Sequence, residues 1–192
     1  MRKVSYYKPS IGSEEIDEVV RTLKSGWLTT GEKTKLFETE FARYVNQPHT
    51  VALNSCTAAL HLALEAIGLK AGDVVVVPTL TFAATAEVVQ YFNARPLLVD
   101  CREEDFNIDV TDAENRIRSA KAGGCQIKAI IPVHYGGQIV DVEGICQLAD
   151  QFSLKVIEDA AHCCPAFFRT GPEEEWQSAG SFSDVSCYSF YA

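Results

Sequence analysis

The chain has 192 residues, of which 47% are hydrophobic and 22% are charged, and its formal net charge is −9 at pH 7. This length suffices for the core of one domain, and the acidity argues against nucleic-acid binding. The longest apolar runs are as long as strands and far shorter than a membrane span, and the basic residues at positions 1–7 precede no apolar stretch of signal-peptide length. We therefore expect no membrane partner and a cytoplasmic location.

Predicted strands and helices alternate along the chain. The first helix has its N-cap at Ser13, apolar residues at helical spacing and a stop at Gly26. The strands that follow are rich in Val and Ile, which is typical of strands buried on both faces of a parallel sheet. The alternation predicts an α/β fold with a mostly parallel sheet and helices on both faces. The later elements are strand 51–53 with helix 58–67, strand 74–77 with helix 83–92, strand 96–99 with helix 112–117, strand 127–132 with helix 142–152, strand 155–157 and closing strands within 181–190.

Two acidic residues end the predicted strand that begins at Lys155. The segment runs Val-Ile-Glu-Asp-Ala-Ala-His, so that Asp159 lies at the carboxyl end of a buried strand and His162 follows three residues later. Ligands gather at this edge of an open α/β sheet, and an aspartate there can pair with a ring nitrogen that must stay protonated, such as that of pyridoxal phosphate. The alternative interpretation is that Asp159 caps a following helix.

A phosphate site is indicated where the predicted strand 51–53 meets the helix that follows it. Ser55, Cys56 and Thr57 lie at the start of this helix, where free backbone N–H groups and the hydroxyls of Ser55 and Thr57 can hold a phosphate. The alternative is an ordinary Ser or Thr N-cap. Cys56 has the position at which a helix N-terminus can lower a thiol pKa, although we expect it to serve as a small residue.

Two further segments carry groups that suit the same cofactor. Phe82 follows the apolar strand 74–77 and precedes a helix, so that its ring can lie flat on a cofactor ring, although an aromatic at this spacing is more often core. Ser189 ends the last predicted strand and can add a hydroxyl to the phosphate.

The cysteines are odd in number and lack the paired spacing of a zinc site, so no metal is expected. We interpret them as buried thiols, with small apolar residues preferred over a strained vicinal disulfide for the adjacent pair. They are Cys56, Cys101, Cys125, Cys146, Cys163, Cys164 and Cys187.

Taken together, the segments resemble the DegT/DnrJ/StrS family of pyridoxal-phosphate-dependent sugar-nucleotide aminotransferases. The resemblance covers almost the whole chain and implies the large domain of the type I aspartate-aminotransferase fold over residues 1–192, without a C-terminal small domain. The segments, in family order, are 26–31 with the helix 36–44, then 54–60, 78–85, 132–136, 158–162 and 189–190.

The resemblance implies a role for each candidate residue. Ser55, Cys56, Thr57 and Ser189 would contact the phosphate, Phe82 would stack on the pyridine ring, and Asp159 would pair with its nitrogen. His162 stands where the family usually has Gln, which contacts the ring hydroxyl, and a histidine can make a similar hydrogen bond. Thr29 and Thr30 would lie near the sugar nucleotide. His134 and Tyr135 would face the site as well, although Tyr135 could equally well be a core residue.

The family also has a Schiff-base lysine a few residues after the serine of the Ser-Phe motif, and this chain ends at Ala192 before that position. Lys128 and Lys155 flank strands and are interpreted as solvated. We therefore expect an N-terminal part of a longer homodimeric enzyme that is inactive without the lysine.

The reaction implied is transfer of an amino group, with glutamate as donor, to a keto-sugar nucleotide. Two alternatives stay open. One is a sugar dehydratase of the same fold that has histidine in place of the lysine and uses pyridoxamine phosphate. The other is a non-catalytic remnant that keeps the cofactor pocket.

Overall fold

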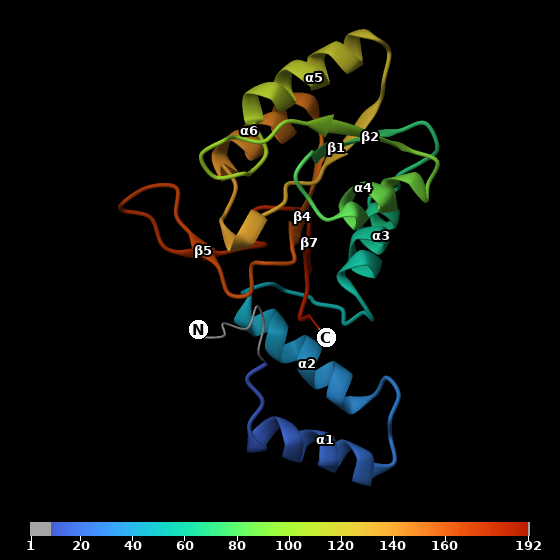
Figure 1. The fold of residues 1–192 in the computed structure, drawn as a ribbon, viewed down its shortest axis with the longest axis vertical. Coiled ribbons are helices and arrows are strands. Elements are labelled where there is room, and N and C mark those ends of the chain that lie inside the picture. The colour runs from blue at the N-terminus through green and yellow to red at the C-terminus, as the bar shows by residue number, and fades with distance from the viewer. Residues whose placement is uncertain (1–8, 192) are drawn as a thin grey trace, which may run out of the picture.

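The computed structural model describes residues 9–191, so that the basic stretch at 1–7 lies outside the described residues. Five parallel strands form one sheet in the order β2-β1-β3-β4-β7, with helices on both faces (Figure 1). The elements are α1 (Ser13–Ser25), α2 (Glu32–Tyr44), α3 (Cys56–Ala66), β1 (Val74–Pro78), α4 (Ala83–Gln90), β2 (Arg95–Val99), α5 (Val110–Ala122), β3 (Ile127–Ile130), the short 3₁₀ turn Tyr135–Gly137, α6 (Val142–Phe152), β4 (Lys155–Ala160), β5 (Phe167–Phe168), β6 (Gln177–Ser178) and β7 (Val185–Tyr188).

The four valines of β1 show how the sheet is buried on both faces. Side chains of a strand alternate between the two faces, and here Val74 and Val76 join one core cluster while Val75 and Val77 join the other. α5 and α6 cover the first cluster, and α3 and α4 cover the second. All four valines are at most 1% exposed. The predicted α/β fold with a parallel sheet is confirmed.

α1 and α2 form a helical hairpin outside the helices that cover the sheet (Figure 1). α2 contacts β7 through Phe41 and Tyr188, whose ring centroids lie 5.2 Å apart. α1 begins and ends close to the prediction, but its N-cap is Gly12 rather than Ser13, because the side chain of Glu15 accepts the Gly12 N–H at 2.6 Å. The left-handed Gly26 (φ 74°) ends α1 as predicted. No residue of α1 is buried.

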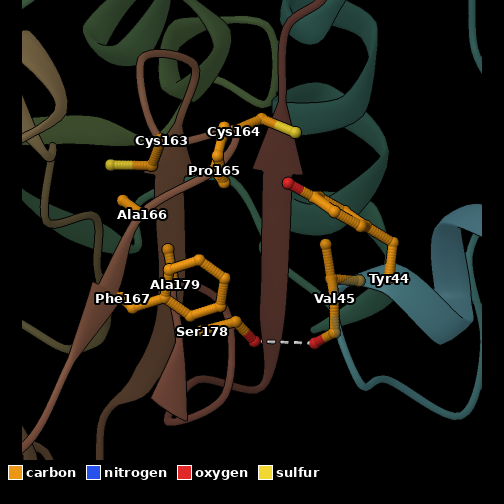
Figure 2. Close-up of a pocket in the computed structure, with 9 residues that line it drawn as sticks. All are labelled: Tyr44, Val45, Cys163, Cys164, Pro165, Ala166, Phe167, Ser178 and Ala179. Carbon is orange, nitrogen blue, oxygen red and sulfur yellow. Dashed lines mark hydrogen bonds between the residues drawn. The ribbon is translucent and has the colours of Figure 1, made fainter. Parts of the chain in front are cut away.

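The end of α2 is tied to the hairpin formed by β5 and β6. The hydroxyl of Ser178 donates to the Val45 carbonyl at 2.8 Å (Figure 2). The Gln47 side-chain amide donates to the Gly180 carbonyl at 3.0 Å. A small apolar hollow opens at this junction between Tyr44 and the Cys164–Pro165 peptide (Figure 2).

Residues 51–53 do not form the predicted strand. The Ala52 N–H donates to Oε1 of Glu38 at 2.9 Å, so that a side chain of α2 takes a backbone donor that a neighbouring strand would otherwise bind. The Thr50 hydroxyl also donates to the Glu38 carbonyl. The closing strands predicted within 181–190 are also reduced to one, since only β7 pairs there, with β4.

The expectation that the cysteines are buried is correct for two of them. All seven are free, Cys163 and Cys187 are buried, and Cys164 is exposed. The other four are half-buried. Within residues 9–191, no set of three or more His, Cys, Asp or Glu side chains is arranged to hold a metal ion. None of the helices described is long and apolar enough to cross a membrane.

Candidate cofactor site

The strands of the sheet all end at the same edge, where the candidate residues follow them. The strand order reverses direction at β1, because β2 lies on one side of it and β3, β4 and β7 lie on the other. Such a switch point is where open α/β sheets bind ligands. Thr81 and Phe82 follow β1, His162 follows β4 and Ser189 follows β7.

Asp159 lies inside β4 and is 5% exposed. Its Oδ2 accepts a hydrogen bond from the Thr85 hydroxyl at 2.7 Å, and its Oδ1 accepts one from the Ala161 N–H at 3.3 Å. The chain after Asp159 runs through turns at 161–165, so that the helix-cap interpretation is wrong. A carboxylate offers about four acceptor positions, and these two bonds leave room for a further donor.

The contact from Thr85 was not predicted from the sequence. Thr85 lies in the first turn of α4, is fully buried, and shares a hydrogen bond of 2.7 Å with the hydroxyl of Thr81. The i, i+4 spacing of the two threonines across the start of a helix was the signal available. Their partner in β4 lies 74 residues further along the chain, which no local pattern reveals.

Phe82 is 79% exposed and is the N-cap of α4. The interpretation of Phe82 as a core residue is therefore wrong. The Thr85 N–H donates to the Phe82 carbonyl at 3.1 Å, so that one helical turn connects the exposed ring to the residue that contacts Asp159.

The start of α3 combines both interpretations of its sequence. Ser55 is an ordinary N-cap, since its hydroxyl accepts the Ala58 N–H at 3.1 Å. Cys56 and Thr57 are the first two helical residues, and their N–H groups have no acceptor within the helix. These two N–H groups and the positive end of the helix dipole suit a phosphate.

The thiol of Cys56 lies close enough to Asp159 for the carboxylate to affect its pKa. Burial and, secondarily, the negative charge of Asp159 raise the pKa of Cys56 to about 12. The lowered pKa considered from the sequence is therefore wrong, because burial and a nearby carboxylate both disfavour the thiolate. The charge of Asp159 acts on Cys187 of β7 as well.

His162 is exposed, and its ring is fixed by a backbone contact. Its Nδ1 accepts the Gly136 N–H at 3.2 Å, so that the proton of the neutral ring is on Nε2. Its ring stacks on Tyr191, with centroids 6.0 Å apart and planes at 11°, and Tyr135 approaches edge-on at 6.3 Å. Tyr135 therefore lies beside His162, and it is exposed rather than a core residue.

His134, by contrast, is wholly buried and does not face the site. Its Nδ1 accepts the Val140 N–H at 3.3 Å, and its Nε2 lies 2.7 Å from Oε2 of the equally buried Glu158. Glu158 also accepts the Gly180 N–H at 2.9 Å. Adjacent residues of a strand point to opposite faces, which is why Glu158 has a separate set of partners from Asp159.

The remaining candidates are divided between this edge and the helical hairpin. Ser189 directly follows β7, whose Tyr188 pairs with Ala160 one residue after Asp159. Thr29 and Thr30 lie in the loop between α1 and α2, which the fold does not bring to the sheet edge (Figure 1). Lys155 forms an exposed ion pair with Asp184 at 2.6 Å.

The comparisons with known proteins bear on this arrangement. Residues 9–192 match the sequence model of the DegT/DnrJ/EryC1/StrS aminotransferase family. The chain is 42% identical over 187 residues to the spore coat polysaccharide biosynthesis protein SpsC of Bacillus subtilis, covering 97% of this chain and 45% of SpsC. It is also 42% identical over 186 residues to an uncharacterised protein of Methanocaldococcus jannaschii, with the same coverage.

Solved structures of similar fold agree with the family match. Spr1654 of Streptococcus pneumoniae, described as a sugar aminotransferase in its PMP form, has a TM-score of 0.88 at 32% identity and covers 100% of this chain and 49% of its own. DesV of S. venezuelae has a TM-score of 0.82 at 32% identity, covering 93% of this chain and 45% of its own. The chain thus spans about half the length of these relatives. The expected fold is confirmed, and the PLP form of Spr1654 together with the family match confirms the expected cofactor.

Proposed function

The chain belongs to the DegT/DnrJ/EryC1/StrS aminotransferase family, and we propose that residues 1–192 are the pyridoxal-phosphate-binding large domain of an enzyme that transfers an amino group from glutamate to a keto-sugar nucleotide. The buried carboxylate of Asp159 at the sheet edge is the observation that carries this proposal. The name of the relative SpsC, a protein of polysaccharide biosynthesis, supports a sugar substrate.

The residues at the edge fit the cofactor. Asp159 keeps acceptor capacity for a protonated ring nitrogen, and the exposed ring of Phe82 is free of core packing and available to stack. The N–H groups of Cys56 and Thr57, with the hydroxyls of Ser55 and Ser189, would hold the phosphate. The Nε2–H of His162 would donate to the ring hydroxyl, since Gly136 occupies Nδ1.

Pyridoxal phosphate, when bound, supplies an electron sink for the carbon that loses a proton. Asp159 would strengthen this sink by holding a proton on the ring nitrogen, and Phe82 would keep the ring in one plane. A lysine following residue 192, at the position expected from the family, would move the proton between carbons as a general base. None of the lysines within the chain is assigned this role.

The substrate and partners belong to the same proposal. Thr29 and Thr30 lie away from the sheet edge of their own chain, so a homodimer in which the α1–α2 loop reaches the partner's site would give them contact with the sugar nucleotide. A cytoplasmic location is part of the same proposal.

The test is a matched pair of variants of the whole protein, Asp159→Asn and Asp150→Asn. Asp150 is an exposed residue of α6, and its substitution makes the same chemical change away from the edge. We expect Asp159→Asn to lower the turnover of the glutamate half-reaction about 100-fold while cofactor affinity changes much less, because the interaction acts on developing charge. Unchanged turnover in Asp159→Asn would overturn the proposal.

A further inference from the structure

A chain of three side chains connects the start of α4 to the middle of the sheet. The Thr81 and Thr85 hydroxyls lie 2.7 Å apart, and the Thr85 hydroxyl lies 2.7 Å from Oδ2 of Asp159. Thr85 is fully buried and Asp159 nearly so, so that water does not compete for these bonds.

The direction of the bonds follows from the chemistry of the groups. A carboxylate only accepts, so Thr85 donates its single hydroxyl proton to Asp159. The oxygen of Thr85 is then left to accept, and Thr81 is the donor of the second bond. Thr81 therefore orients the hydroxyl of Thr85, and Thr85 orients the carboxylate.

Few other hydrogen bonds hold the carboxylate of Asp159 in one orientation about its Cβ–Cγ bond. The Ala161 N–H contact at 3.3 Å is the one other hydrogen bond to this carboxylate among the described residues, and it is long. Thr85 also lies one turn after Phe82, whose carbonyl accepts the Thr85 N–H. One helical turn thus connects the backbone of Phe82 to the residue that contacts the carboxylate.

We propose that Thr85, oriented by Thr81, is a positioning residue that aims the carboxylate of Asp159 at the ring nitrogen of the cofactor. This inference rests on the proposed function, since it requires the ring to lie between Phe82 and the sheet edge. Thr85 itself would not touch the cofactor, so that its effect passes entirely through Asp159.

The experiment compares the affinity of the whole apoprotein for pyridoxal phosphate and for its analogue in which carbon replaces the ring nitrogen. Both carry the same aldehyde and phosphate, so that the ratio of their dissociation constants isolates the contact with the nitrogen. We expect the wild type to prefer pyridoxal phosphate. In Thr85→Val we expect this ratio of dissociation constants to fall about tenfold, which is the size expected of a misdirected charge-assisted hydrogen bond. Thr85→Ser, which keeps the hydroxyl, is expected to retain it.

Four further variants make the possible outcomes distinguishable. Thr81→Val should reduce the preference less than Thr85→Val, and the double variant should show no additional loss, because both act through one bond. Thr79→Val makes the same change at an exposed position, where the hydroxyl lies 3.7 Å from Sγ of Cys101 and the backbone N–H donates to the Val99 carbonyl, and it should keep the preference. Asp159→Asn should abolish it.

Equal weakening of both ligands in Thr85→Val would mean that Thr85 supports the fold alone, and it would overturn the inference while leaving the proposed function intact. A wild-type protein that binds both ligands equally would overturn the proposed function itself. If Thr85→Val does not fold, retention of the full preference by Thr81→Val would overturn the inference.

Discussion

Replacing Glu158 by Ala should destabilise the fold far more than any surface substitution. Glu158 is fully buried and accepts hydrogen bonds from Nε2–H of His134 at 2.7 Å, from the Gly180 N–H at 2.9 Å and from the Ser186 hydroxyl at 3.4 Å. Alanine would leave the His134 and Gly180 donors buried without an acceptor, whereas the Ser186 hydroxyl would keep the Gly180 carbonyl at 3.2 Å. Each unsatisfied group costs about 1–3 kcal/mol, so we expect a loss of about 4 kcal/mol in the free energy of unfolding.

The assay is urea unfolding of the whole protein followed by circular dichroism. With a slope of about 2 kcal/mol per molar urea, the midpoint of Glu158→Ala should fall by about 2 M. Glu158→Gln should fall less, because its amide oxygen can take the place of Oε2 and keep the two short bonds as neutral ones. Glu114→Ala is the matched control, since its ion pair with Arg118 is exposed and should contribute at most about 0.5 kcal/mol.

A double-mutant cycle with His134→Ala separates the pair from the other contacts of Glu158. If the two residues act as one unit, the double variant should be more stable than the sum of the single losses predicts, by about 1–3 kcal/mol. A midpoint for Glu158→Ala that matches that of Glu114→Ala would refute the reasoning, because it would show that the donors find other partners at no cost.

Three further outcomes follow from the structure. Cys56, whose pKa is raised to about 12 by burial and by the nearby Asp159, should be alkylated by iodoacetamide at pH 8 far more slowly than the exposed Cys164, as measured by peptide mass mapping, and a faster Cys56 would contradict its placement. Burial raises the pKa of Asp184, but hydrogen bonds from Lys155 and from a backbone N–H outweigh burial and lower the pKa below its ordinary value of 3.8. Asp184→Asn should therefore lose stability at neutral pH, and its difference from the wild type should vanish as the pH falls below 3.8. A difference that persists in acid would exclude the ionised carboxylate as the cause. Gly137→Ala should destabilise by about 1–3 kcal/mol in thermal unfolding, since φ is +86° and the new Cβ would lie 2.9 Å from a backbone carbonyl oxygen of His162; an unchanged midpoint would show that the turn relaxes.

The strands and helices of the parallel sheet could be predicted, because hydrophobic periodicity is a pattern among neighbouring residues in the sequence. The helix 142–152 has the predicted bounds, and β1 begins at the predicted Val74. The unbroken run of valines in β1 signals burial on both faces, which only a sheet covered by helices provides.

Features that depend on distant partners were missed or mistaken. The sequence of 51–53 favours a strand, but the side chain of Glu38 competes for its backbone. β5 and β6 contain two residues each, too few for an alternating pattern. The burial of His134 depends on Glu158, 24 residues away, and nothing local distinguishes it from the neighbouring Tyr135, which stays near the site.

The two acids of β4 show how one dipeptide serves both stability and the candidate chemistry. The strand alternation sends Glu158 and Asp159 to opposite faces, so the same backbone carries a fully bonded carboxylate on one side and a carboxylate with spare acceptor capacity on the other. The partners of Glu158 include His134, which begins the turn whose Gly136 N–H fixes the ring of His162. The structural acid thus holds the turn that orients the proposed contact to the ring hydroxyl, while its neighbour is the residue proposed to pair with the ring nitrogen. The Glu-Asp order cannot be reversed without exchanging these two environments.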